Sequence, residues 1–380
     1  MSPTTSGRNA GLARELDERG ARLLLSRIAE PYDEKVQGLV AEHGIFDLVG
    51  YAVSDGRTPD GVPLTRMQAR LESSLRQDDG AIARTLGCRI LVPGDEEWPD
   101  VLDELEQPPW CLWVRGPLRL HQVVDRSVAV VGARASSSYG DEATARLAFT
   151  LAEKGYTIIS GAALGIDAVA HRAALHAGGR TVAALAGGVD VPYPRANSDL
   201  IAKIASDGAL VSESPPGGAP ARMRFLARNR VIAALSLGTV VVEAGLRSGA
   251  RTTLRYARDL GRHVMAVPGP VTSALSAGCH EEIRHGATLV TDAAEVAEMI
   301  GRMGEDLTSP KRGADRDGDE LEPEIRRVWQ WLRPRTSLSV DELMVRSGLG
   351  LAEVLSALGD LEQRGLAEQL LDGWKRRGGA

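Results

Sequence analysis

The segment SVAVVGARASSSYGDEATARLAFTLAEKGYTIIS, residues 127–160, contains the repeating unit from which we predict the fold. Its first residues, Ser127–Val131, form a continuous apolar run, which is typical of a strand covered on both faces. After a polar turn, Asp141–Lys154 has apolar residues at helical spacing, and Gly155 suits the end of that helix. A second apolar run, Tyr156–Ser160, predicts the next strand. Strand, helix and strand in this order indicate a right-handed βαβ unit in a parallel sheet.

The same alternation extends outward from this unit in both directions. It predicts an α/β fold with a Rossmann-like, doubly wound, mainly parallel sheet, in which ligands bind at the carboxyl ends of the strands. The remaining strands are expected at Arg89–Pro93, Cys111–Gly116, Arg180–Ala186, Ala209–Ser212, Thr239–Glu243, His263–Val267 and Thr288–Thr291, and the later helices at Ile166–Ala177, Ala196–Ser206, Arg228–Leu235, Ala250–Leu260 and Cys279–His285.

Composition divides the 380-residue chain into three predicted domains and a linker. Residues 1–88 contain short helical patterns separated by Gly, Pro and Asp, which suggest a small helical domain of the SAM or helix-hairpin-helix kind. Residues 89–300 form the extended Rossmann-like domain. Residues 301–321 are charged and nearly devoid of large apolar side chains, so we expect a flexible linker there. Residues 322–380 show three helices and a hairpin, a pattern typical of a winged helix-turn-helix domain.

Bulk properties favour a cytoplasmic protein that is not a general polyanion binder. The net charge is −6, so any nucleic-acid site must be a local basic patch. The three cysteines, Cys88, Cys111 and Cys279, lack the spacing of a disulfide framework or a zinc site. The chain has no signal-peptide pattern and no run of roughly 18 apolar residues, so we expect no membrane association. We predict no metal and no cofactor.

The segment RMRFLARNR, residues 222–230, is the densest basic stretch of the chain. It contains four arginines in nine residues of an acidic protein, and Phe225 lies among them. Arginines can hold phosphates while an aromatic ring stacks on a base. The alternative is a solvated charge run with Phe225 in the core, but the clustering favours a functional site.

A second candidate is the first βα turn, GARASSSYG, residues 132–140. It is neither GxGxxG nor a P-loop, but it opens a helix and carries hydroxyl groups and Arg134. Helix N-termini, hydroxyls and a guanidinium all suit a phosphate oxygen. A tight turn with a solvated arginine is an equally good interpretation of this segment alone.

Catalytic residues are not predicted. Asp167 and His171 share a helix face without a nucleophile in line, so we interpret His171 as a packing histidine. Glu213 and Glu243 end two strands at one edge and could form an acid/base pair. We favour instead a structural role, in which they pair with Arg228, Arg230 or Arg251.

Taken together, these motifs resemble the DNA-processing protein A (DprA) family. They occur over residues 89–300 in family order: GARxxSxYG (132–140), SGxAxGIDxxAH (160–171), GGVD to YP (187–194), Ser212-Glu213, FxxRNR (225–230), VVVEAxxxSGAxxT (240–252) and VPG (267–269).

The resemblance implies a non-enzymatic homodimer that binds single-stranded DNA and loads RecA onto it during natural transformation or homologous recombination. It also implies which residues contact DNA. Some family members have a lysine where this chain has Leu164, so one cationic contact is absent or is replaced by another arginine. The predicted DNA-binding set is Arg134, Ser160, Gly161, Phe225, Arg228, Asn229, Arg230 and Arg251.

An enzyme is the alternative, because nucleotide-binding phosphoribohydrolases of the lysine-decarboxylase-like group have a similar sheet. Their PGGxGT loop has only a partial counterpart in Pro215–Gly218, and Glu243 lies on a separate strand. The third helix of the C-terminal unit, Leu351–Arg364, carries Glu353, Asp360 and Glu362, and an acidic helix does not suit the major groove of duplex DNA. We therefore expect this unit to contact protein, or duplex DNA only through residues 375–377.

Overall fold

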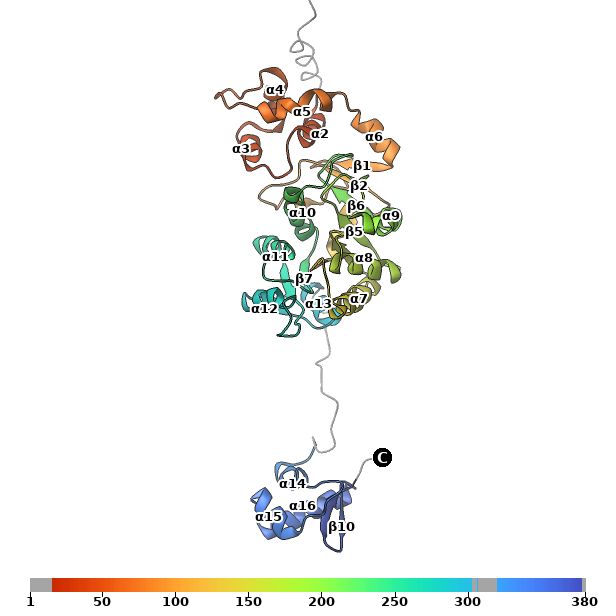
Figure 1. The fold of residues 1–380 in the computed structure, drawn as a ribbon, viewed down its shortest axis with the longest axis vertical. Coiled ribbons are helices and arrows are strands. Elements are labelled where there is room, and N and C mark those ends of the chain that lie inside the picture. The colour runs from red at the N-terminus through yellow and green to blue at the C-terminus, as the bar shows by residue number, and fades with distance from the viewer. Residues whose placement is uncertain (1–15, 303–305, 307–319, 378–380) are drawn as a thin grey trace, which may run out of the picture. The chain divides into compact units, whose positions relative to one another are not determined.

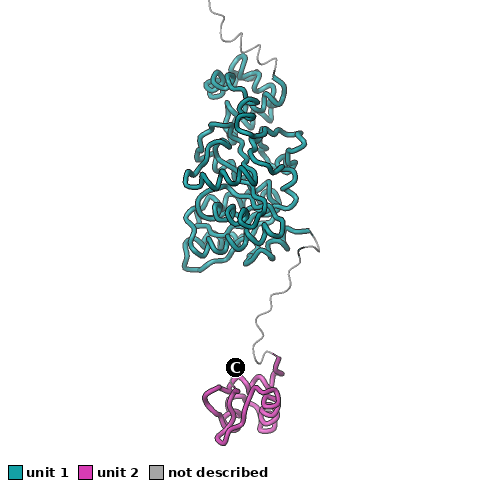
Figure 2. The backbone as a smooth tube through the Cα atoms, turned by 90° about the vertical axis from the view of Figure 1, so that its right-hand side faces the viewer, with its two compact units in different colours: residues 1–308 teal, residues 309–380 magenta. Residues whose placement is uncertain are grey.

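The computed structural model describes residues 16–302, 306 and 320–377. The chain divides into two compact units, residues 1–308 and 309–380, which Figure 2 distinguishes by colour. The first unit holds both the helical segment and the large sheet, and the second is the C-terminal unit. Most of the predicted linker lies outside the described residues, as do the first fifteen residues of the chain.

Short helices form the N-terminal part of the first unit (Figure 1), as the sequence predicts. Asp17, Asp33 and Asp78 accept hydrogen bonds from backbone N–H groups at the starts of three of them, which supplies partners that the first turn of a helix lacks. The apolar faces of the first four helices form a core of their own around Leu25 and Leu48, and this core also includes Trp110. The helices are α2 (Glu18–Ile28), α3 (Glu34–His43), α4 (Ile45–Ser54), α5 (Thr65–Leu75) and α6 (Asp79–Leu86).

A nine-stranded sheet follows, in the order β1-β2-β6-β5-β4-β3-β7-β8-β9. The first two strands pair antiparallel with their neighbours, and the others run parallel. The predicted α/β fold class is therefore confirmed. The strand order reverses between β3 and β7, so the crevice expected of a doubly wound sheet lies at their carboxyl ends. The strands are β1 (Cys88–Leu91), β2 (Leu112–Arg115), β3 (Ser127–Val131), β4 (Thr157–Ser160), β5 (Thr181–Ala184), β6 (Ala209–Ser212), β7 (Gly238–Val241), β8 (His263–Ala266) and β9 (Thr288–Leu289).

Helices cover both faces of the sheet (Figure 1). The side chains of α7, α8 and α13 pack with one face, and those of α10, α11 and α12 pack with the other. Both cores consist mainly of alanine, valine, leucine and isoleucine, which allows close packing of helix on sheet. The helices are α7 (Ser138–Glu153), α8 (Ile166–His176), α9 (Ser198–Asp207), α10 (Arg222–Ala234), α11 (Ala250–Asp259), α12 (Ala277–Arg284) and α13 (Ala293–Ile300).

Two helices differ from the sequence prediction. Helix α10 begins at Arg222, six residues before the predicted start, so the basic segment is helical rather than a loop. Its first turns mix arginines with apolar residues and carry no apolar stripe, yet arginine, methionine and leucine all have high helix propensity. Helix α13 was not predicted, although Asp292 caps it and Val296, Ala297 and Ile300 are buried.

The second unit is a winged helix-turn-helix, as predicted. The Ser339 hydroxyl accepts a hydrogen bond from the Glu342 N–H, and the Glu342 carboxylate accepts one from the Ser339 N–H, which completes a capping box. Leu343, Val354, Leu358 and Trp374 contribute to its core. Its elements are α14 (Pro323–Trp329), α15 (Val340–Ser347), α16 (Leu351–Gln363), β10 (Ala367–Leu370) and β11 (Gly373–Arg376).

Within the described ranges, no helix is both long enough and apolar enough to cross a membrane.

Candidate nucleic-acid interface

A groove of about 720 Å³ lies at the carboxyl ends of β3 and β7, where the strand order reverses. One wall is helix α10, and the other is formed by the loop after β7 and the first turn of α11. The turn after β3 brings Arg134 to the same space. Side chains that line it include Arg134, Asp167, Tyr193, Arg222, Phe225, Arg228, Asn229, Arg247 and Thr253.

The helical state of residues 222–230 divides the basic segment between two faces. Side chains three or four positions apart lie on the same side of a helix. Accordingly, Arg222, Phe225 and Asn229 line the groove. Arg224 and Arg230 bond instead with the turn at residues 30–31 and with Glu213, on the rear side of the helix.

Aromatic and guanidinium groups stack at the mouth of the groove. The Arg134 guanidinium carbon lies 4.9 Å from the centre of the Phe225 ring. The Tyr193 ring lies 5.6 Å from the same ring, at 56° to its plane. Arg134 is exposed, and Tyr193 retains 45% of its accessible surface. These groups therefore present π faces and a cation to solvent, a combination that suits a base next to a phosphate.

Arg228 lies at the floor of the groove. Its Nη1 donates a hydrogen bond to the Ala184 carbonyl at 2.6 Å, and its guanidinium occupies the space that a side chain on Gly161 would need. Burial lowers the pKa of Arg228 to about 10, while the neighbouring Asp167 carboxylate opposes that change. The guanidinium therefore remains charged at neutral pH and places a buried positive charge beneath the groove.

Of the eight predicted DNA-binding residues, Arg134, Phe225, Arg228 and Asn229 line the groove. Ser160 and Gly161 lie beneath it: the Ser160 hydroxyl is buried and donates to the Val130 carbonyl at 2.6 Å. The other two predicted residues, Arg230 and Arg251, do not line the groove.

Arg230 and Arg251 instead make ion pairs within the protein. Arg230 is 2% exposed, and its Nη2 donates to Glu213 at 2.7 Å. Arg251 donates from Nε to Glu282 at 2.6 Å and from Nη1 to the Leu246 carbonyl at 2.7 Å. The sequence pattern could not separate these arginines from the groove-lining ones, because their carboxylate partners come from other elements.

Three cationic or aromatic residues of the groove were missing from the predicted DNA-binding set, namely Tyr193, Arg222 and Arg247. Each could have been found from the sequence, because Tyr193 and Arg247 lie in segments that follow predicted strands, and Arg222 begins the basic stretch. Leu164 is 43% exposed and directly follows the groove residue Ala163. Arg222 and Arg247 are exposed cations that line the same groove.

The two strand-end carboxylates have structural roles, as favoured from the sequence. Glu213 pairs with Arg230; burial raises the pKa of the Glu213 carboxyl, and Arg230 opposes that rise. Glu243 does not pair with an arginine here. It is 1% exposed and accepts hydrogen bonds from the Ser137 N–H at 2.9 Å and the Ser137 hydroxyl at 2.5 Å, which holds the turn that carries Arg134.

His171 is a buried packing histidine, as predicted. Its Nδ1 lies 2.7 Å from the Thr181 hydroxyl, and its Nε2 accepts a hydrogen bond from the Ala162 N–H. Because Thr181 donates its own proton to the Ile158 carbonyl, Nδ1 is the protonated nitrogen of a neutral ring. Burial, assisted by the Arg228 charge, lowers the pKa of His171 to about 3.

This lowered pKa predicts an acid-dependent loss of stability. In the unfolded chain the histidine ring is protonated near pH 6.5, whereas in the folded protein it is protonated only near pH 3. The contribution of the neutral His171 ring to the free energy of unfolding is therefore fully present above pH 6.5 and is lost as the pH falls toward 3. We expect the free energy of unfolding to fall less between pH 7 and pH 4 in His171→Gln than in the wild type. Titration of the His171 ring near pH 6.5 by NMR would contradict this expectation.

Among the described residues, no group of three or more His, Cys, Asp or Glu side chains is arranged to hold a metal ion.

The fold and the groove together place the chain among Rossmann-like α/β proteins that also carry a winged-helix unit. Residues 89–301 match the family model described as DNA recombination-mediator protein A, and residues 312–373 match the DprA winged helix domain. A DNA processing protein assigned as DprA in Mycobacterium tuberculosis is 45% identical over 356 residues, covering 90% of both chains.

Solved structures agree with this assignment. The crystal structure of DNA processing protein A from Streptococcus pneumoniae superposes with a TM-score of 0.61 at 33% identity, over 76% of this chain and 99% of that one. DNA processing protein A from Helicobacter pylori, whose structure concerns its single-stranded DNA binding mode, gives 0.50 at 30% identity, over 55% and 93%. The chain belongs to the DprA family of DNA processing proteins.

Proposed function

We propose that this protein binds single-stranded DNA in the groove between α10 and α11 and passes it to RecA during recombination or transformation. It acts without catalysing a reaction, as a cytoplasmic homodimer. The observation that carries the proposal is the stack of Arg134 on Phe225, with Tyr193 beside it, above the charged Arg228. Bases can stack on such rings whatever their identity, and guanidinium groups hold phosphates without reading sequence.

The proposal of RecA loading is supported by the family description as a recombination mediator. The enzyme alternative has less support. Glu243, the carboxylate that it would require, is buried and is bonded to Ser137 at both oxygens. Helix α16 also gives little support to duplex recognition by the second unit, since Leu351 and Leu355 are exposed on it and Leu351–Gln363 contains no lysine or arginine.

Fluorescence anisotropy with labelled oligo-dT and a duplex of equal length tests this function. We expect preferential binding of the single strand, because stacking on Phe225 needs bases that are unpaired. The logarithm of the affinity should fall linearly with the logarithm of the salt concentration, by about 0.7 for each phosphate contacted. A second assay should follow RecA filament formation on oligo-dT covered with a single-strand-binding protein, with and without this protein.

Equal binding of both DNAs, or binding indifferent to salt, would contradict the single-strand proposal. Release of free base from a nucleoside monophosphate would favour the enzyme. Single-strand binding without any stimulation of RecA would confine the function to DNA protection.

A further inference from the structure

One turn of the N-terminal helical segment, Glu30-Pro31-Tyr32, is bonded to the rear face of helix α10. Arg224 donates from Nε and Nη2 to the two Glu30 carboxylate oxygens, at 2.8 and 3.2 Å. Six residues further along α10, Arg230 donates from Nη2 to the Pro31 carbonyl at 3.3 Å, and its guanidinium lies over the Tyr32 ring. The helix is therefore held at two points on the side opposite to its DNA-facing residues.

The same turn also reaches the other wall of the groove. The Tyr256 hydroxyl of α11 lies 3.3 Å from the Tyr32 hydroxyl. The first turn of α11 contributes Ala250, Thr252 and Thr253 to the groove. A single turn from a distant part of the chain thus contacts both helices between which the groove is formed.

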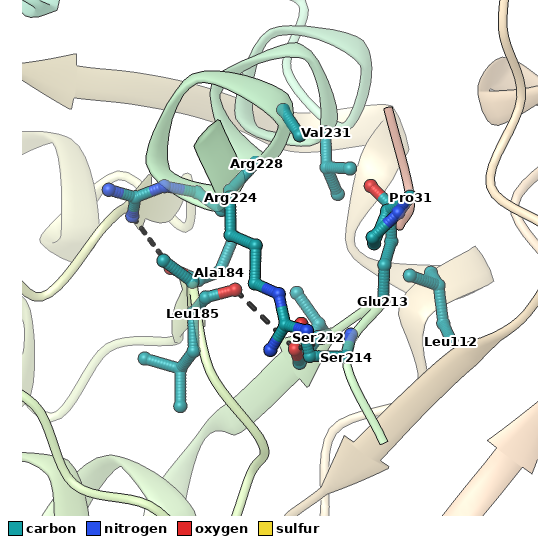
Figure 3. A pocket seen from close by; sticks show the side chains of 13 residues that line it. Pro31, Leu112, Ala184, Leu185, Ser212, Glu213, Ser214, Arg224, Arg228 and Val231 are labelled. Carbon is teal, nitrogen blue, oxygen red and sulfur yellow. Dashed lines mark hydrogen bonds between the residues drawn. The ribbon is translucent and has the colours of Figure 1, made fainter. Parts of the chain in front are cut away.

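The space behind α10 is nearly filled by side chains. Figure 3 shows Arg224 and Arg228 extending from α10 toward strand ends, with Pro31 and Glu213 across from the helix. The cavity that Pro31, Glu213, Ala227 and Arg228 line there has a volume of only about 10 Å³. Phe225 and Asn229 belong to this same helix, so a rotation of α10 about its axis would move both side chains relative to the groove that they line.

We infer that the Glu30-Pro31-Tyr32 turn is a positioning element that sets the orientation of α10 for single-stranded DNA. The inference rests on the proposed function of the groove, but the turn itself lines no part of that groove. Its ion pair is partly exposed, with Glu30 and Arg224 side chains 36% and 18% accessible. Its effect is therefore on geometry, since a pre-organised site loses affinity when its supporting contacts are removed.

The Glu30→Ala variant separates this role from simple charge neutralisation, because the two roles predict opposite changes in DNA affinity. If Glu30 only masked the charge of Arg224, its removal would free a cation near the groove and strengthen DNA binding. If it positions α10, removal weakens oligo-dT binding, by about threefold to tenfold for a supporting contact of this kind. The salt dependence should keep its wild-type slope, because no phosphate contact is lost.

Arg70 provides the matched control. It donates to the same Glu30 carboxylate at 2.8 Å but belongs to α5, so it does not hold α10. We would measure oligo-dT binding of Glu30→Ala, Arg224→Ala, the double variant and Arg70→Ala, with thermal unfolding of each. The positioning role predicts weaker binding in the first two, no further loss in the double variant, and wild-type binding in Arg70→Ala.

Stronger binding by Glu30→Ala, or additive losses in the double variant, would overturn the positioning role. If Glu30→Ala fails to fold, Glu30→Gln keeps a hydrogen-bond acceptor and tests the same contact. Failure of the proposed function of the groove would give a different result. The wild-type protein would then not bind oligo-dT, or would bind it equally well without the Arg134 side chain.

Discussion

Replacing Arg230 by alanine should lower the free energy of unfolding by about 3–5 kcal/mol, the cost of leaving one member of a buried ion pair alone. Arg230 is 2% exposed, and its partner Glu213 is 9% exposed. Without the guanidinium, the Glu213 carboxylate would lie in the core without the ion pair that it makes with Arg230. Chemical denaturation of wild type and variant measures the difference directly.

A matched control comes from the same helix. Arg222 is exposed at the start of α10, so Arg222→Ala should change the free energy of unfolding by only about 0.5 kcal/mol or less. Arg230→Met combined with Glu213→Leu should recover most of the loss, because an apolar pair of similar volume needs no ionic partner. Unchanged stability of Arg230→Ala, with a shallower salt dependence of DNA binding, would instead mean that Arg230 contacts phosphate as first predicted from the sequence.

The Phe225 and Arg134 side chains should contribute to DNA affinity in different ways. Phe225→Ala should weaken oligo-dT binding by about 1–3 kcal/mol, the usual contribution of one stacked base, and leave the salt slope unchanged. Arg134→Ala should weaken binding and also reduce the magnitude of the slope by about 0.7, because one phosphate contact disappears. Anisotropy titrations across a salt series separate the two effects.

Because Arg134 stacks on Phe225, the losses in the double variant should sum to less than the two single losses added together. Arg146 of α7 carries the same charge but does not line the groove. The Arg146→Ala variant should therefore keep both the affinity and the salt slope near the wild-type values. Equal losses in Arg146→Ala and Arg134→Ala would indicate a diffuse electrostatic effect and would contradict a defined groove.

The sequence was sufficient for the architecture wherever local pattern decides it. Ser127–Val131 and Ala209–Ser212 were predicted with the bounds that the structure shows, because strands buried on both faces are continuous apolar runs. The winged-helix unit was predicted from a pattern of three helices followed by a hairpin, and the structure shows these elements. Helix α10 was predicted too short, since its first two turns have no apolar periodicity from which a helix could be recognised.

What the sequence by itself determined is the parallel α/β sheet, the C-terminal winged helix and the two segments, residues 132–140 and 222–230, that contribute arginines to the groove. These depend on periodicities and turns that are local in the chain. Only the tertiary structure decided which arginines face the groove, because their partners are remote: Arg224 meets Glu30 across 194 positions. The meeting of Tyr193 with Phe225 is likewise a consequence of folding. A guanidinium is directed by the carboxylate or ring that lies nearest in space, and the order of residues along the chain does not specify which one that is.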